Sequence, residues 1–286
     1  MTDNPFLVST DWLAERLDAP DITIVDGSWY LPTQNRNAVA EYAAGHIPGA
    51  VHFDIEAIAD HDNPLPHMLP RPEAFARAVS ALGIGDGMRI VIYDGAGLFS
   101  APRVWWTFRT FGAADVVVLD GGAPKWRAEG RPWTDEPTRR RAKTFTARLD
   151  HGAVADAADI ARALDTGSAQ IVDARPGERF RGEVPEPRPG LRAGHIPGSH
   201  SLPGSSLLAD GRLLDRAALV AAFQAAGVDL DRPVVTSCGS GVSAAIVSLA
   251  LAGLGRPARA LYDGSWTEWG ANADLPAATG PASPRR

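Results

Sequence analysis

The sequence predicts an α/β protein built from two copies of one domain, each a small parallel β-sheet flanked by helices. Short apolar runs typical of buried strands alternate with patterns typical of amphipathic helices, and several short motifs occur twice in the same order. Buried strands that alternate with helices are characteristic of parallel sheets whose two faces are both covered.

The individual elements follow from apolar periodicity. Uninterrupted runs of β-branched and other apolar residues predict buried strands, whereas apolar residues three and four positions apart predict helices. The strands are expected at 22–25, 90–93, 116–119, 171–172, 234–236 and 259–261, and the clearest helices at 72–82 and 216–226.

The duplication is visible in four pairs of matching segments. The pentapeptide Gly-His-Ile-Pro-Gly occurs at 45–49 and returns unchanged at 194–198. The other pairs are 24–26 with 171–173, 90–97 with 234–241, and 119–121 with 262–264. The spacing between the copies is nearly constant and is too long for a solenoid, so it fits two copies of one domain.

The domain limits follow from composition. We expect a first domain at 1–135, a linker at 136–155 and a second domain at 156–286. The linker region contains Pro137 and a cluster of arginines, and it has little apolar periodicity. The tail after Pro276 is rich in Ala, Pro, Gly and Ser, and we expect it to fray.

Composition excludes several classes of protein. The chain has 286 residues, 45% hydrophobic content and a net charge of −6, which argues against a nucleic-acid binder or a protein that binds anionic membranes. A single cysteine cannot form an intramolecular disulfide, and the N-terminus lacks the pattern of a signal peptide. The longest apolar run, 244–254, is too short to cross a bilayer. We therefore expect a soluble cytoplasmic protein.

Cys238, the one cysteine, stands where a predicted strand turns into a helix. Glycines at such a turn let backbone amides converge into an anion-binding nest, and N–H groups at a helix start favour negative charge. The sequence therefore predicts a thiolate nucleophile in a small cradle that suits one added sulfur atom, a persulfide. The alternative is an inert, half-buried thiol. The cradle residues are Gly239, Ser240, Gly241, Val242 and Ser243.

Two other functions share this segment. Cysteine phosphatases also use a strand–loop–helix cradle, but they need an arginine to close it, and the chain has Ala244 six positions after the cysteine. The spacing Gly239-x-Gly241-x-x-Ala244, followed about 20 residues later by Asp263, also satisfies a loose dinucleotide-binding pattern. That pattern is short and gives the cysteine no role.

The tandem copies, the repeated GHIPG pentapeptide, the single cysteine loop and the segment YDGSWTEW at 262–269 resemble two-domain rhodanese sulfurtransferases. The resemblance runs from about residue 7 to 269. The loop CGSGVS is similar to that of members that use 3-mercaptopyruvate, whereas members that use thiosulfate carry basic residues after the cysteine. The resemblance implies two tandem rhodanese-like domains with only the second catalytic, since Asp94 stands in the first copy where the second has Cys238.

The resemblance also implies a mechanism. The Cys238 thiolate attacks the sulfur of 3-mercaptopyruvate, pyruvate leaves as an enolate, and the persulfide passes its outer sulfur to a thiol such as thioredoxin or to cyanide. No metal or organic cofactor is expected. A thiosulfate donor and a non-catalytic rhodanese-type binding module are the alternatives.

A 2-oxo acid substrate needs donors for its carboxylate, and arginine makes paired, charge-assisted bonds to carboxylates. Spacing alone does not choose among Arg179, Arg181 and Arg188. The match to the family selects Arg179 and Arg188 as the substrate-binding pair, with Arg181 the competitor for the first role.

The family's proton relay would consist here of Ser240, His67 and Asp54. A histidine can exchange a proton near neutral pH. The alternatives are a loop histidine at 67 and a helix-capping aspartate at 54. His46 and His195 have no second ligand at metal-binding spacing, so we expect them to shape the same turn twice.

Overall fold

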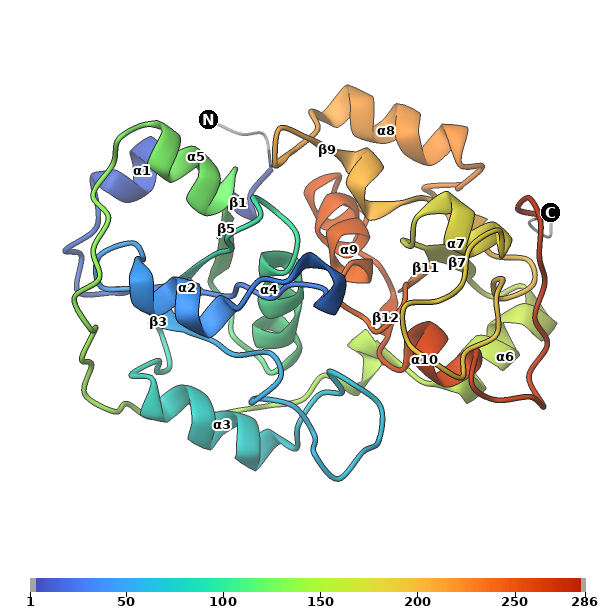
Figure 1. Cartoon of the computed structure of the whole chain (residues 1–286), viewed down its shortest axis with the longest axis horizontal. Coiled ribbons are helices and arrows are strands. Elements are labelled where there is room, and N and C mark those ends of the chain that lie inside the picture. The colour runs from blue at the N-terminus through green and yellow to red at the C-terminus, as the bar shows by residue number, and fades with distance from the viewer. Residues whose placement is uncertain (1–3, 284–286) are drawn as a thin grey trace. The chain divides into compact units, whose positions relative to one another are not determined.

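The computed structural model of the chain describes residues 4–283, which fall into two compact units (Figure 1). Each unit contains one five-stranded sheet in which every pair of neighbouring strands is parallel. The strand orders, β1-β5-β4-β2-β3 and β6-β12-β11-β7-β8, repeat the same topology. The predicted fold, two tandem α/β domains with small parallel sheets, is confirmed.

The first sheet is formed by β1 (Leu7–Val8), β2 (Ile22–Asp26), β3 (Val51–His52), β4 (Arg89–Tyr93) and β5 (Val116–Leu119). Its helices are α1 (Thr10–Ala14), α2 (Ala38–Ala44), α3 (Pro72–Ala81), α4 (Ala101–Thr110) and α5 (Gly122–Ala128), with a 3₁₀ turn at Pro32–Gln34. Leu13 of α1 and Trp126 of α5 pack on Ile24 and Val91 of the sheet. Phe75 of α3 and Phe108 of α4 form an aromatic cluster of their own.

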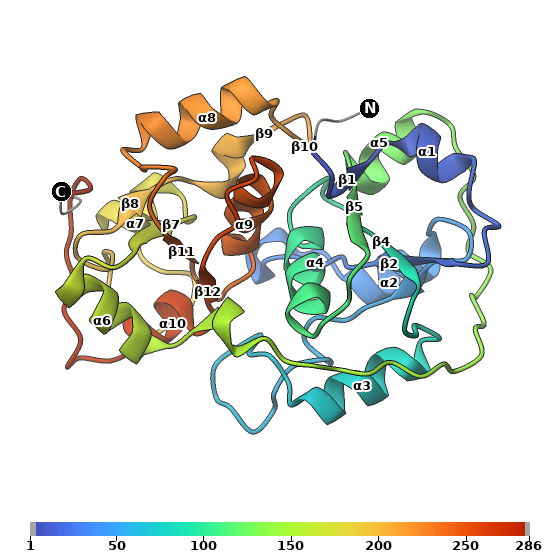
Figure 2. The same cartoon turned by 180° about the vertical axis from the view of Figure 1, so that it is seen from behind.

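The second sheet is formed by β6 (Val154–Ala155), β7 (Gln170–Asp173), β8 (His200–Ser201), β11 (Val234–Ser237) and β12 (Ala260–Tyr262). The helices are α6 (Ala157–Thr166), α7 (Gly177–Arg181), α8 (Arg216–Ala225), α9 (Ala244–Gly253) and α10 (Ser265–Trp269), with 3₁₀ turns at His151–Ala153 and Gly204–Leu207. Helices α6 and α10 lie on one side of this sheet and α8 and α9 on the other (Figure 2). Ile160 of α6 and Trp266 of α10 share one core with Ile171 and Val235.

The predicted strands and helices all occur, and each predicted end agrees with the structure to within one residue. The two strands predicted to end at Val25 and Val172 each continue to an aspartate, Asp26 and Asp173. Aspartate is a poor strand former, but the backbone of both residues still pairs with the neighbouring strand. Each of these aspartates therefore stands at the carboxyl end of its sheet, where ligands bind in parallel α/β folds.

The two units do not coincide with the two halves of the sequence. Residues 62–68 of the first copy belong to the second unit, and residues 209–213 of the second copy belong to the first. Segment 209–213 contains part of the short hairpin formed by β9 (Leu208–Ala209) and β10 (Arg212–Leu213). Arg212 Nε of this segment donates to Asp120 Oδ2 of the first copy at 2.9 Å. Each copy of the sequence thus contributes one segment to the unit formed mainly by the other copy.

The chain changes from the first unit to the second between Asp150 and His151. The segment before this point packs on the first unit, where the ring centroid of Phe145 lies 5.5 Å from that of Phe75. The precise limits of a linker at 136–155 remain a prediction.

The expectation of a frayed tail after Pro276 is wrong for the residues that follow it directly. Ala278 exchanges two backbone hydrogen bonds with His195, at 2.8 and 2.9 Å. The amide of Gly280 donates to the carbonyl of Arg181 at 2.9 Å. Backbone hydrogen bonds to His195 and Arg181 outweigh the loop-like composition of the tail.

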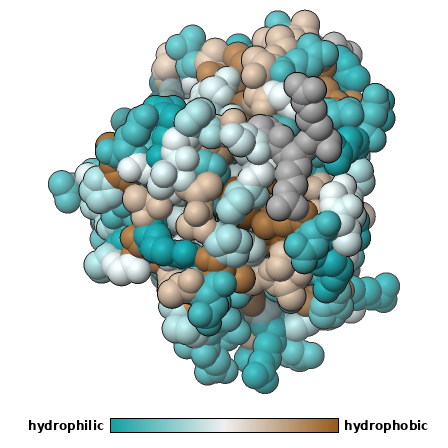
Figure 3. Space-filling view, turned by 90° about the vertical axis from the view of Figure 1, so that its right-hand side faces the viewer, coloured by the Kyte–Doolittle hydropathy of each residue, from teal (hydrophilic) through white to brown (hydrophobic). Residues whose placement is uncertain are grey.

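One face of the molecule offers little continuous apolar area. On the face in Figure 3, hydrophobic residues are scattered in small patches among hydrophilic ones. The exposed large hydrophobic side chains in the described part of the chain are Val39 and Val184. Between residues 4 and 283, no helix combines the length and the apolar character that crossing a membrane requires.

Candidate active site

Cys238 directly follows β11, a central strand of the second sheet, and a short loop connects it to α9. The helix begins at Ala244, after Ser243. Gly241 has φ +79°, a left-handed conformation that glycine adopts without steric cost. The cysteine is thus placed at the carboxyl edge of the sheet, and its residue is only 2% exposed.

Helix α10 orients the peptide groups of the cysteine loop. The amide of Trp266 donates to the carbonyl of Cys238 at 3.0 Å, and the amide of Thr267 donates to the carbonyl of Gly239 at 2.9 Å. In a trans peptide the N–H points opposite to the C=O. The amides of Gly239 and Ser240 are therefore directed away from α10.

In the first copy, the equivalent loop surrounds a carboxylate of its own chain. Asp94, the counterpart of Cys238, is fully buried, and its carboxylate accepts four backbone N–H bonds of 2.7 to 2.9 Å. The donors are Ala96, Phe99, Ser100 and Ala101. Burial raises the pKa of Asp94, and these hydrogen bonds act in the opposite direction. The loop following the fourth strand of this fold can thus surround an anion with amides.

Ser265 holds the cysteine from the α10 side. Its hydroxyl accepts the amide of Cys238 at 3.2 Å and donates to the carbonyl of Tyr262 at 2.7 Å. Ser265 has φ +47°, which is uncommon for a residue other than glycine, and the first copy has Gly122 at the matching position with φ +53°. The second copy therefore keeps a strained serine where its hydroxyl fixes the backbone of the cysteine.

A buried charge cluster lies beside the loop. Arg175, at the end of β7, donates to Asp173 Oδ2 at 2.6 Å and to Glu186 Oε1 at 2.8 Å. Burial lowers the pKa of the Arg175 guanidinium, but the charges of its neighbours, Asp173 first and Cys238 among them, outweigh burial and raise it. The Arg175 guanidinium therefore lies close enough to Cys238 for the two groups to interact electrostatically.

The three candidate arginines lie in different surroundings. Nη2 of Arg179 lies 3.2 Å from the point where a Cβ on Gly239 would stand, so this guanidinium borders the cysteine loop. Arg181 is 40% exposed and pairs with the exposed Glu183 at 2.7 Å. Arg188 is half-buried in the connection between α7 and β8. The geometry favours Arg179 over Arg181 as a substrate ligand, and the role of Arg188 stays a prediction.

His67 and Ser240 meet inside the second unit. His67 Nδ1 lies 3.0 Å from the Ser240 hydroxyl oxygen, although 173 positions separate the two residues. His67 is 3% exposed and has φ +63°, an uncommon left-handed conformation. Asp54 belongs to the first unit, where its carboxylate accepts the amides of Glu56 and Ala57 at 2.8 and 3.2 Å. Asp54 thus caps a turn at residues 55–58 rather than a helix, and its part in a relay stays a prediction.

Known proteins are similar to this chain along nearly its whole length. The rhodanese-like domain family matches residues 9–129 and 156–272. The chain belongs to the rhodanese family. It is 49% identical to the 3-mercaptopyruvate sulfurtransferase of Escherichia coli K12 over 95% of this chain and 97% of that protein. It is also 42% identical to a bovine thiosulfate sulfurtransferase, over 92% of this chain and 91% of the relative.

The fold agrees with solved rhodanese structures. The crystal structure of SseA from Escherichia coli matches with a TM-score of 0.85 and 46% identity, covering 93% of this chain and 99% of the other. The resemblance that the sequence motifs suggested is therefore confirmed, and so is the pair of rhodanese-like domains.

The repeated histidines of this rhodanese do shape the same turn twice. His46 Nδ1 lies 2.9 Å from the carbonyl of Tyr42, and His195 Nδ1 lies 2.8 Å from the carbonyl of Phe180. Each histidine also joins an isolated antiparallel bridge, to Thr134 and to Ala278 respectively. Across residues 4–283, no group of three or more His, Cys, Asp or Glu side chains could hold a metal ion.

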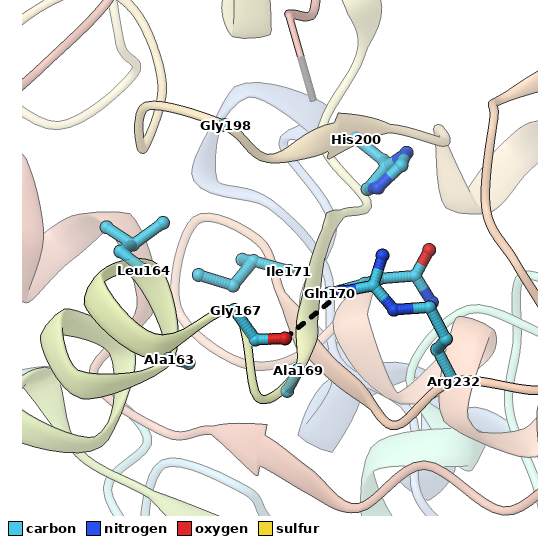
Figure 4. Close-up of a pocket in the computed structure, with 9 residues that line it drawn as sticks. All are labelled: Ala163, Leu164, Gly167, Ala169, Gln170, Ile171, Gly198, His200 and Arg232. Carbon is cyan, nitrogen blue, oxygen red and sulfur yellow. Dashed lines mark hydrogen bonds between the residues drawn. The ribbon is translucent and has the colours of Figure 1, made fainter. Parts of the chain in front are cut away.

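A small hollow of the second rhodanese domain lies away from the cysteine. It opens at the amino-terminal end of β7, beside Gln170, His200 and Arg232, where Arg232 Nη2 donates to the carbonyl of Gly167 at 3.1 Å (Figure 4). Its volume of about 40 Å³ has room for a few water molecules only. Cys238 stands at the opposite, carboxyl end of the sheet, where the chemistry of parallel α/β folds is found.

Sequence reasoning missed Arg175, Glu186 and Ser265. The signal for Arg175 was its place two positions after the repeated Ile-Val-Asp motif, at the end of a buried strand. Glu186 had no comparable signal among several surface glutamates. Ser265 could have been noticed because it matches a glycine of the first copy.

Proposed function

We propose that this rhodanese transfers sulfane sulfur from 3-mercaptopyruvate, through a persulfide on Cys238, to an acceptor thiol or to cyanide. The observation that carries the proposal is the cysteine at an amide-lined turn with the Arg179 guanidinium at its border. The donor carries the carboxylate that such an arginine would bind. The absence of a basic side chain from Gly239 to Ser243 suits this donor better than dianionic thiosulfate.

The reaction needs two sulfur transfers. The Cys238 thiolate attacks the donor sulfur and forms an S–S bond, while the donor C–S bond breaks and its electron pair leaves on the pyruvate enolate. A proton then converts the enolate to pyruvate. An acceptor thiolate, for example of thioredoxin, attacks the outer sulfur of the persulfide, and the Cys238 thiolate is released.

The backbone amides of the loop and the side chains around it would have different roles in these transfers. The amides of Gly239, Ser240, Gly241, Val242 and Ser243 would stabilise the thiolate and the persulfide. Arg179 and Arg188 would hold the 2-oxo acid. Ser240 and His67, which share a 3.0 Å contact, would move the proton to the enolate, and Asp54 would support the histidine.

The acceptor must come from outside the chain, because no second cysteine is present to resolve the persulfide. A protein that depends on one reactive thiol, and that has no intramolecular disulfide, suits a reducing compartment. We therefore propose that it works in the cytoplasm, where small thiols and thioredoxin-like proteins are available.

Donor choice is the first test. Pyruvate release from 3-mercaptopyruvate is expected to exceed sulfur transfer from thiosulfate at least about tenfold in kcat/KM, which corresponds to about 1.4 kcal/mol of differential transition-state binding. Cyanide serves as the common acceptor in both assays, and thiocyanate is measured. A preference for thiosulfate would instead assign the activity of the bovine relative, with which this chain shares 42% identity.

The arginines provide a second test with a matched control. Arg179→Met is expected to raise KM for 3-mercaptopyruvate about 10- to 100-fold, because a hydrogen-bonded charge contact contributes roughly 1.5–3 kcal/mol. Arg181→Met removes an exposed ion pair and should change KM less than about twofold. Equal effects of the two substitutions would contradict the assignment of Arg179.

A further inference from the structure

Glu186 holds two arginines that flank the cysteine loop. Its side chain is 1% exposed, and its carboxylate lies between the guanidinium groups of Arg175 and Arg179. Arg175 Nη1 donates to Oε1 at 2.8 Å. Arg179 uses its Nε and Nη2 edge for Oε1 and Oε2, so both carboxylate oxygens are engaged.

Arg175 fixes one end of this arrangement to the sheet. Its Nη2 donates to Asp173 Oδ2 at 2.6 Å and to the carbonyl of Gly194 at 2.8 Å. Its guanidinium also lies over the ring of Trp266, 4.5 Å from the ring centroid. Because Arg175 is held from several sides, Glu186 in turn is anchored at a defined position.

Arg179 is the more exposed of the two arginines. It belongs to α7, a helix of five residues, and its side chain is 16% exposed. A long side chain on a short helix has many rotamers, and the pairing with Glu186 restricts them. The edge that Glu186 binds is the Nε and Nη2 edge, and Nη2 lies beside Gly239.

A buried ion cluster is not explained by stability alone. Desolvation of two carboxylates and two guanidiniums offsets much of their attraction, and apolar side chains of similar volume often stabilise a core as well or better. What a charged cluster provides is a fixed direction for each guanidinium, since the planar fork binds a carboxylate in one geometry.

We propose that Glu186 is a positioning residue that fixes the Arg179 guanidinium at the border of the Cys238 loop and thereby sets the affinity for the donor's carboxylate. The inference rests on the proposed function, because it takes Arg179 as the group that binds the donor. Glu186 binds the Nε and Nη2 edge of the Arg179 guanidinium. The Nη1 group and the second hydrogen of Nη2 can then donate to the carboxylate of the sulfur donor.

The test compares Glu186→Gln with Glu183→Gln. Glutamine offers one acceptor oxygen to two guanidiniums, and its NH₂ group faces a donor, so Arg179 loses its alignment. KM for 3-mercaptopyruvate is expected to rise about tenfold while kcat changes less than about threefold. Glu183→Gln removes an exposed carboxylate that pairs with Arg181 and should leave both constants within about twofold.

A double-mutant cycle separates positioning from general damage. If Glu186 acts through Arg179, Glu186→Gln is expected to raise KM no further in the Arg179→Met background. Multiplied effects on KM would overturn the proposal, as would an unchanged or lowered KM in Glu186→Gln alone. Should Glu186→Gln fail to fold, Glu186→Asp decides: a raised KM at unchanged Tm supports positioning, and an unchanged KM contradicts it.

The outcome for the wild-type protein keeps the two proposals apart. If wild-type protein releases no pyruvate from 3-mercaptopyruvate, the proposed function fails. If wild-type protein is active and Glu186→Gln retains the wild-type KM, only the positioning role fails.

Discussion

Replacing Cys238 with serine is expected to abolish sulfur transfer while the protein stays folded. A serine hydroxyl stays protonated at neutral pH and forms no persulfide, and the chain has no second cysteine to take over. Loss of an attacking nucleophile typically costs several orders of magnitude, so pyruvate release should fall at least about 10³-fold. The substitution changes one atom in a buried loop, and Tm is expected to stay close to that of the wild type.

Intact mass measured after exposure to 3-mercaptopyruvate provides the direct readout. Wild-type protein should gain the mass of one sulfur atom, and Cys238→Ser should gain none. A third protein, Cys238→Ser with Ser168→Cys, presents a thiol at an exposed position outside the loop. It is expected to release no pyruvate, because the surface thiol lacks the amides and the arginine. Turnover by either variant would show that the loop is not the reactive site, and absence of any added sulfur on wild-type protein would favour a non-catalytic binding module.

The strands of this protein are predictable because both faces of each sheet are covered. A strand buried on two sides is apolar along its length, as Val116–Leu119 is, and such a run is visible without knowledge of its neighbours. The ends are less predictable, since Asp26 and Asp173 extend their strands through pairing with a neighbouring strand. That pairing is a property of the assembled sheet.

The position of the cysteine loop between a strand and a helix was predictable for the same local reason. Cys238, Gly239 and Gly241 lie together in the sequence, and the strand before them and the helix after them can be recognised. The contact between His67 and Ser240 spans 173 positions, so only the likeness to a family indicated it. The residues alone did not.

The charge cluster could not be predicted, because burial of a charged residue depends on its partners. Glu178, Glu183 and Glu186 all stand among arginines in one short segment. Glu183 is exposed and Glu186 is buried, and the difference is that Arg175 reaches Glu186 from the end of β7. A carboxylate can be buried only where such partners are already in place.

Asp94→Ala is expected to give the largest loss of stability of the substitutions considered. The carboxylate of Asp94 is fully buried and accepts four backbone N–H bonds, and alanine would leave these donors without their anion. A net contribution of roughly 1 kcal/mol per hydrogen bond, partly offset by the desolvation of the carboxylate, gives a loss of about 2–4 kcal/mol. Urea or thermal unfolding measures it.

Asp86 provides the matched control for Asp94. Its exposed carboxylate also accepts two hydrogen bonds, from the amide and the hydroxyl of Thr146, at 2.8 and 2.7 Å. Asp86→Ala should cost no more than about 1 kcal/mol, because water replaces the carboxylate as a partner. Equal losses for the two variants would mean that the burial of Asp94 is unimportant.

A small anion should replace the missing carboxylate of Asp94. Glycine at this position removes the Cβ and leaves space beside the four amides, so sodium formate is expected to raise the Tm of Asp94→Gly more than sodium chloride at equal ionic strength does. Formate should leave the Tm of wild-type protein unchanged, because Asp94 already fills the site. If formate has no selective effect, the amides do not form an anion site by themselves, and the parallel between Asp94 and a Cys238 thiolate loses its physical basis. If the effect is selective, the loop of this fold stabilises an anion independently of sulfur chemistry, and the second copy differs from the first in which group supplies the charge.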